Sequence, residues 1–139
     1  MDRKLLKKAE QQAKKAYAPY SNFYVGAAVL LENGKIITGC NQENASYPLS
    51  LCAERVALFT AHSKYPTFAI ERLAIIAINP NNKVCNPISP CGACRQVIRE
   101  SELRSKQDIK IILKGETDQT IIMDSIKILL PLSFDGSAL

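Results

Sequence analysis

The chain has 139 residues, of which 47% are hydrophobic and 22% are charged, and these values exclude a disordered or low-complexity protein. Its net charge is +5, but six of its 18 lysines and arginines fall within the first fifteen residues, around an apolar stripe at helical spacing. This distribution favours a solvated helix face over a nucleic-acid-binding surface. The longest apolar runs are too short to span a membrane and no secretory signal is visible, so we expect a cytoplasmic protein without a membrane segment.

The first third of the chain predicts a helix followed by a hairpin. Leucine and alanine recur at helical spacing after Asp2, a plausible N-cap, and Pro19 ends this pattern. Two apolar, β-branched runs follow, Val25–Leu31 and Ile36–Cys40. Asn33-Gly34 joins them, and this dipeptide is the strongest short signal for a tight turn. We therefore expect an antiparallel strand pair.

The remaining chain alternates helices and strands. The predicted elements are, in order, a loop over 42–49, a helix over Leu51–Ala61 capped by Ser50, a buried strand over Leu73–Ile78, a helix over Cys91–Leu103, a strand over Ile109–Leu113, a short strand over Thr120–Met123, and a last helix that Asp124 caps and Pro131 ends. This order predicts an α/β protein with one mixed β-sheet of about five strands and helices packed against it. With no linker or repeat visible, residues 1–139 are expected to form a single domain.

The five cysteines point to metal binding, because their number is odd and no export signal accompanies them. Cys52 opens one predicted helix, and Cys91 and Cys94 form a Cys-x-x-Cys pair at the start of another. Helix N-termini lower the pKa of thiols, and thiolates are the form that binds Zn²⁺. Three protein ligands leave the fourth tetrahedral position open, as in catalytic zinc sites. Cys40 and Cys85 lack ligand spacing and are interpreted as a buried apolar residue and a loop thiol.

Glu54 follows Cys52 by two positions, in the first turn of the predicted helix. From there its carboxylate could reach a water bound to the metal, although an acidic residue at this position also complements the helix dipole. His62, the only histidine, lies far down the same helix, and we expect it to be structural or exposed rather than a metal ligand.

Two motifs resemble the zinc motifs of the small cytidine deaminases: Cys52-Ala53-Glu54-Arg55 and Ser89-Pro90-Cys91-Gly92-Ala93-Cys94-Arg95-Gln96. The segments over 18–28 and 39–45 and the tail over 129–134 are similar to family segments too, although Leu132 and Ser133 depart from the small residues usual there. The resemblance implies the three-layer cytidine deaminase fold, with helices on both faces of the sheet. It also implies a homotetramer with shared active sites that deaminates cytidine and 2′-deoxycytidine.

The resemblance also assigns roles to individual residues. It implies Cys52, Cys91 and Cys94 as zinc ligands, Glu54 as the proton shuttle, Ala53 beside the substrate, Phe23 against the base, Asn41 and Glu43 on the ribose hydroxyls, and Tyr47 and Phe134 reaching across subunit interfaces. Because three thiolates would give a zinc centre a net charge of −1, we expect Arg55 and Arg95, which follow the ligands on the two helices, to draw charge off the sulfurs; solvation at the surface is the alternative for both. Phe134 could equally cap the core of its own subunit. Zinc is the only cofactor that this chemistry needs, since it activates a water while Glu54 moves the protons.

Three other functions stay open at this point. One is deamination of a different aminopyrimidine nucleoside, such as blasticidin S. A second is editing of RNA or DNA, which would require a basic channel that the sequence does not clearly show. A third is a non-catalytic zinc module, in which Glu54 would be dispensable.

Overall fold

Five strands form one mixed sheet in the computed structural model, which describes all 139 residues, Met1–Leu139. The strands are β1 (Tyr24–Leu31), β2 (Ile36–Cys40), β3 (Ile70–Ile78), β4 (Lys110–Lys114) and β5 (Thr120–Met123). Their spatial order is β2-β1-β3-β4-β5, in which β3 and β4 are parallel and the other neighbours are antiparallel. The predicted mixed sheet is therefore confirmed.

The hairpin predicted from Asn33-Gly34 is confirmed. Gly34 has a φ of +81°, in the left-handed region that glycine adopts without steric cost. The Leu31 N–H donates to the Lys35 carbonyl at 2.9 Å, and Leu30 pairs with Ile36. The turn brings β2 back beside β1, so that the residues after Cys40 lie next to the start of β1.

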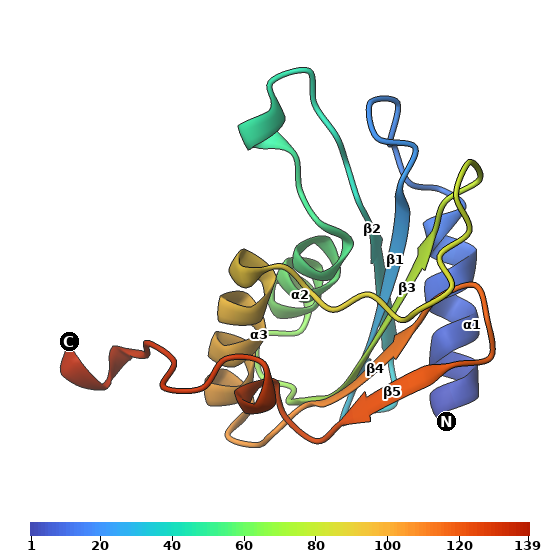
Figure 1. Cartoon of the computed structure of the whole chain (residues 1–139). Helices are drawn as coiled ribbons and strands as arrows, with labels where there is room; N and C mark the ends of the chain where they lie inside the picture. The colour runs from blue at the N-terminus through green and yellow to red at the C-terminus, as the bar shows by residue number, and fades with distance from the viewer.

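Helices cover both faces of the sheet, as Figure 1 shows. Helix α1 (Asp2–Ala13) packs on one face, and α2 (Ala53–Lys64) and α3 (Gly92–Ser105) pack side by side on the other. Alternate side chains of β1 point to opposite faces of the sheet. Ala28 and Leu30 belong to the hydrophobic core between the sheet and α1, whereas Ala27 and Val29 belong to the core between the sheet and α2 and α3. This is the predicted three-layer arrangement. None of the helices is both long and apolar enough to cross a membrane.

Two glycines allow the helices to approach the sheet closely. A Cβ on Gly39 of β2 would lie 2.5 Å from the Ala57 nitrogen and 2.7 Å from the Ala53 carbonyl oxygen of α2. A Cβ on Gly26 of β1 would overlap the Ala9 carbonyl oxygen of α1 on the opposite face. The missing side chain at Gly39 thus sets how near the first turn of α2 lies to the sheet.

The last predicted helix is wrong. Instead of a helix from Asp124 to Pro131, the structure has a single 3₁₀ turn over Ile126–Ile128, capped by Ser125. Ile126 is buried, and its N–H donates to the carboxylate of Glu102. The short stretch between that anchor and Pro131 leaves too few residues to offset the cost of helix nucleation.

The predicted starts of two other helices are shifted. Asp2 lies inside the first turn of α1, with Met1 at the N-cap, and its carboxylate pairs with Arg72 and Lys110 of the neighbouring strands. Helix α2 begins at Ala53 with Cys52 as N-cap, rather than after Ser50. The second shift places Cys52 at the helix terminus itself.

Candidate metal centre and active site

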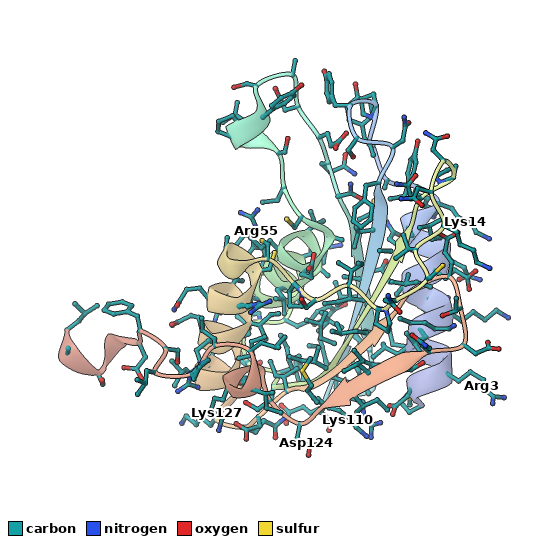
Figure 2. All side chains as sticks on the ribbon, viewed as in Figure 1. Arg3, Lys14, Arg55, Lys110, Asp124 and Lys127 are labelled. Carbon is teal, nitrogen blue, oxygen red and sulfur yellow. The ribbon has the colours of Figure 1, made fainter.

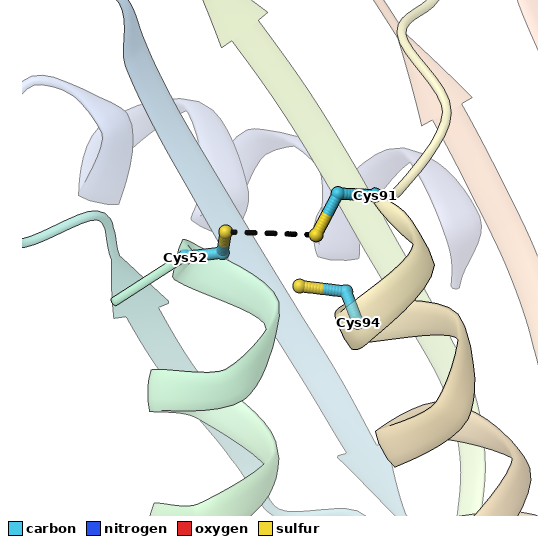
Figure 3. A group of neighbouring side chains, drawn as sticks. All are labelled: Cys52, Cys91 and Cys94. Atoms are coloured by element: carbon cyan, nitrogen blue, oxygen red, sulfur yellow. Dashed lines mark hydrogen bonds between the residues drawn. The ribbon is translucent and has the colours of Figure 1, made fainter. Parts of the chain in front are cut away.

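Three cysteine sulfurs converge where α2 and α3 begin (Figure 3). Cys52 is the N-cap of α2, Cys91 is the N-cap of α3, and Cys94 lies in the first turn of α3. All three Sγ atoms lie within 4.8 Å of one another, and those of Cys52 and Cys91 are 4.0 Å apart. Because α2 and α3 lie side by side on one face of the sheet, their N-termini meet.

This donor set fits zinc. Two sulfurs at about 2.3 Å from a tetrahedral zinc would be about 3.8 Å apart, close to the separation of the Cys52 and Cys91 sulfurs. The hydrogen bond with the Cys94 thiol, followed by contacts with Arg55, lowers the pKa of Cys52 to about 5 despite partial burial. The same contact raises the pKa of Cys94, since neighbouring thiols share a proton. The positive ends of two helix dipoles further favour thiolates at this point.

The other two cysteines lie elsewhere. Cys40 is buried at the end of β2, where its sulfur accepts hydrogen bonds from the side-chain amides of Gln12 and Gln42. Cys85 is exposed in the loop between β3 and α3. Neither sulfur joins the cluster, so three cysteine ligands and one open coordination position are what this arrangement offers a metal.

Glu54 brings a buried carboxyl to the same place. It is the second residue of α2, only 5% of its surface is exposed, and it lines a cavity together with Cys52 and Cys91. Burial raises the pKa of Glu54 to about 7, and the charge of Cys52 adds to the effect. A carboxyl with such a pKa can both accept and donate a proton near neutral pH.

The cavity has a volume of about 460 Å³ and lies between the sheet and the starts of α2 and α3. Four residues predicted to contact the substrate line it: Phe23, Asn41, Glu43 and Ala53. The structure therefore brings together side chains from before β1, after β2 and the start of α2. This size suits a nucleoside-sized molecule.

Asn41 and Glu43 are held in place by backbone groups of the segment that contains Phe23. The Asn41 side chain accepts from the Val25 N–H and donates to the Phe23 carbonyl, both at 2.8 Å. One Glu43 oxygen, Oε1, accepts from the N–H groups of Tyr20 and Ser21 at 3.0 and 3.2 Å. Burial acts to raise the pKa of Glu43, but hydrogen bonds from Ser21 and Tyr20 outweigh it and the pKa is lowered. The Oε2 atom makes none of these bonds.

Comparison with known proteins agrees with this geometry. Residues 1–107 match the family model described as the cytidine and deoxycytidylate deaminase zinc-binding region. This chain belongs to that deaminase family. It is 50% identical over 101 residues to the cytidine deaminase of Halalkalibacterium halodurans, covering 72% of each chain, and 42% identical over 119 residues to that of Sporosarcina psychrophila, covering 86% of this chain and 83% of the relative. The crystal structure of cytidine deaminase from Burkholderia pseudomallei superposes with a TM-score of 0.84 at 38% identity, over 96% of this chain and 99% of the other.

The two arginines in the deaminase motifs differ in what they contact. The Arg55 Nη2 donates to the Cys52 sulfur at 3.5 Å, and this bond raises the pKa of Arg55. Figure 2 labels Arg55 beside the starts of α2 and α3. Its Nε is buried without a hydrogen-bond partner. Arg95 contacts no sulfur and instead donates to Ser89 and to the carbonyls of Pro90 and Leu129. The predicted contact with a ligand sulfur is thus present for Arg55 and absent for Arg95.

Tyr47 and Phe134, the two residues assigned to subunit interfaces of the deaminase, are exposed and lie outside the cavity. Tyr47 packs edge-on against Tyr20 in the loop before α2, with ring centroids 5.8 Å apart. Phe134 lies in the tail, which runs outward past α3 (Figure 1). Phe134 is 66% exposed, so it does not pack into the core of its own chain.

The sequence-based predictions missed several residues of the cavity wall. Ile75 and Ala77 of β3 line it, as do Val25 of β1 and Ile88 and Ser89 of the loop before α3. Alternation along β3 could have identified the first two, because they share a face with the core residue Leu73. His62, by contrast, has the predicted structural position, with its Nε2 3.0 Å from the Ser101 hydroxyl; burial lowers its pKa to about 4.

Proposed function

We propose that this chain catalyses the hydrolytic deamination of cytidine and 2′-deoxycytidine to uridine and 2′-deoxyuridine, releasing ammonia. The observation that carries the proposal is the buried Glu54 carboxyl beside three converging cysteine sulfurs, in a nucleoside-sized cavity. The identity to named cytidine deaminases supports this choice over other aminopyrimidine nucleosides.

Cys52, Cys91 and Cys94 would hold zinc, which when bound would act as a Lewis acid and lower the pKa of the attacking water. Glu54 would accept a proton from the attacking water, transfer one to N3 of the pyrimidine, and later deliver one to the departing amine at C4. Water and cytidine are consumed, and uridine and ammonia are formed. Arg55 would offset the negative charge of the three thiolates through its bond with Cys52.

Asn41 and Glu43 would bind the ribose hydroxyls, and Phe23 and Ala53 would contact the base. Glu43 Oε2 and the unused lone pair of Asn41 Oδ1 supply acceptors for hydroxyl groups. The hydrogen bonds that already hold both side chains would reduce the entropy lost when substrate binds.

The active enzyme would be a cytoplasmic homotetramer. The exposed aromatic residues Tyr47 and Phe134 support this part of the proposal, since each lies outside the cavity of its own chain. In such an assembly Phe134 of one subunit would close the cavity of the next and exclude water from the base.

The decisive experiment is the Glu54→Gln substitution, which keeps the size of the side chain and removes its proton-transfer capacity. We expect zinc content and fold to be retained and ammonia release from cytidine to fall by about 10²–10⁴-fold or more. Near-normal turnover would contradict the mechanism. Wild-type protein that binds zinc but deaminates no nucleoside would instead favour a structural zinc module.

A further inference from the structure

Arg95 makes three hydrogen bonds, two of which bind the segment that precedes the metal ligand Cys91. Its Nε donates to the Pro90 carbonyl at 2.7 Å, its Nη2 donates to the Ser89 hydroxyl at 3.2 Å, and its Nη1 donates to the Leu129 carbonyl at 2.9 Å. Pro90 is directly bonded to Cys91, and Ser89 lines the cavity. One guanidinium thus connects the loop before α3 to Leu129, directly after the 3₁₀ turn over Ile126–Ile128.

The Leu129 end of this connection is itself fixed to the core. Glu102 of α3 is 2% exposed, and its carboxylate accepts from the N–H of Ile126 at 3.0 Å and from the Ser125 hydroxyl at 3.1 Å. The turn that follows leads directly to Leu129. Arg95 therefore anchors Ser89 and Pro90 to a part of the molecule that a buried carboxylate holds in place.

We propose that Arg95 is a positioning residue for the metal centre, which fixes the backbone that places Cys91 and the cavity wall at Ser89. This inference rests on the proposed zinc site. It concerns geometry rather than charge, because the guanidinium makes no contact with a ligand sulfur, unlike that of Arg55.

A planar guanidinium suits this task. Its N–H donors have a fixed relative geometry. The three oxygen acceptors that they bind, on Ser89, Pro90 and Leu129, are therefore held at fixed positions relative to one another. A lysine ammonium at the same place keeps the positive charge but is a compact point donor on a flexible stem and cannot reproduce this geometry. The two variants Arg95→Lys and Arg95→Gln therefore separate geometry from charge.

The experiment measures zinc release from the loaded protein to a colorimetric chelator. Loss of groups that orient metal ligands typically costs about 10–100-fold in metal affinity or activity, so we expect Arg95→Gln to release zinc about tenfold faster or more. Arg95→Lys should resemble Arg95→Gln, and Ser89→Ala, which removes one bond of three, should show a smaller increase. The visible absorption of the Co²⁺-loaded variants should shift from that of the wild type, since it reports ligand geometry at the ion.

Gln96→Ala is the matched control. Gln96 neighbours Arg95 and donates to the Phe134 carbonyl in the tail at 3.0 Å, but makes no hydrogen bond with Ser89 or Pro90. Its zinc release and Co²⁺ spectrum should match those of the wild type. If Arg95→Gln does not fold, as judged by circular dichroism, Arg95→Lys carries the test alone.

Two results would overturn the inference. Wild-type zinc release and Co²⁺ spectra in Arg95→Lys and Arg95→Gln would show that the three bonds do not set the ligand geometry. Full rescue by lysine but not by glutamine would assign the effect to charge. Failure of the wild-type protein to bind zinc or to deaminate cytidine would instead refute the proposed function.

Discussion

Two buried glutamates show how surroundings separate a chemical role from a structural one. Glu102 is 2% exposed, and its carboxylate accepts hydrogen bonds from Ile109, Ile126 and Ser125. Glu54 is 5% exposed, has no hydrogen-bond partner in another residue, and faces the cavity. A buried carboxylate whose bonds are all made within the fold stabilises it, whereas one that bonds to no other residue and faces a cavity is available to a substrate.

At the same scale, the three-cysteine site predicts unequal effects of two cysteine substitutions. Cys91→Ala should abolish stoichiometric zinc binding, because it removes one of three converging sulfurs. Cys85→Ala should retain one zinc per chain, since that thiol is exposed in a loop outside the cluster. Metal analysis of the purified variants decides it, and equal loss of zinc in both would mean that the site is closed by a fourth cysteine.

The polar groups on the cavity wall predict the substrate range. Free cytosine lacks the hydroxyls for Asn41 and Glu43, and the Glu43 carboxylate repels a phosphate, so kcat/KM should be about 10²-fold lower or more for cytosine and cytidine monophosphate than for cytidine. Glu43→Gln keeps an acceptor for the Tyr20 and Ser21 N–H groups and should narrow the gap between cytidine and its monophosphate. Steady-state kinetics on the three substrates would contradict these roles if cytosine were used as efficiently as cytidine.

The helices and strands that a local sequence pattern defines could be predicted from the sequence. Those whose conformation depends on contacts with residues distant in the sequence could not. The hairpin of β1 and β2 follows from Asn33-Gly34 between apolar runs, and the cysteines at two helix starts follow from their spacing. The capping residue and apolar pattern after Asp124 predict a helix when they are taken without tertiary contacts. Its conformation depends on Glu102, which is distant in sequence, and no local pattern encodes that hydrogen bond.

The same limit applies to the candidate site. The motif resemblance assigns Phe23, Asn41, Glu43 and Glu54 to one active site. The hydrogen bonds between the Asn41 side chain and the backbone of Phe23 and Val25 could not be predicted, because they depend on the antiparallel pairing of β1 with its neighbours. The contacts of Arg95 could not be predicted for a related reason. They require the tail to return to α3, which is a property of the tertiary structure.

The close approach of α2 to the sheet predicts that Gly39→Ala impairs both stability and metal binding. The added methyl group would contact the α2 backbone at Ala53 and Ala57 and displace the turn that carries Glu54. Overpacking of this kind costs about 1–3 kcal/mol, which urea unfolding would measure. Zinc affinity, measured by chelator competition on the folded protein, should fall as well.

Gly26→Ala provides the control for that experiment. Its methyl group would overlap Ala9 of α1, on the face of the sheet away from the cysteines. It should destabilise the protein and leave the zinc affinity of the folded molecules unchanged. If both variants lose zinc affinity equally, the effect reflects general unfolding rather than displacement of α2.

For the whole molecule, the exposed tail predicts that active sites are shared between chains. Glu54→Gln chains and Phe134→Ala chains should each be nearly inactive, since one lacks the proposed proton shuttle and the other lacks the residue proposed to close a neighbouring cavity. After the two are dissociated, mixed and reassembled, some sites contain both intact residues, and activity should return in part. Confirmed mixed assemblies with no gain in activity would show that Phe134 does not act in trans.

The three converging sulfurs also link the cellular abundance of this protein to metal supply. Cys52 and Cys91 are 39 positions apart, with α2 and β3 between them. In an unfolded chain, binding one ion with all three sulfurs would therefore cost the conformational entropy of closing this loop. Zinc therefore binds the native state preferentially, and each tenfold rise in free zinc above the dissociation constant adds about 1.4 kcal/mol to stability. Under zinc starvation the protein should open more often and be degraded faster by proteases, so that enzyme levels fall together with the supply of their metal.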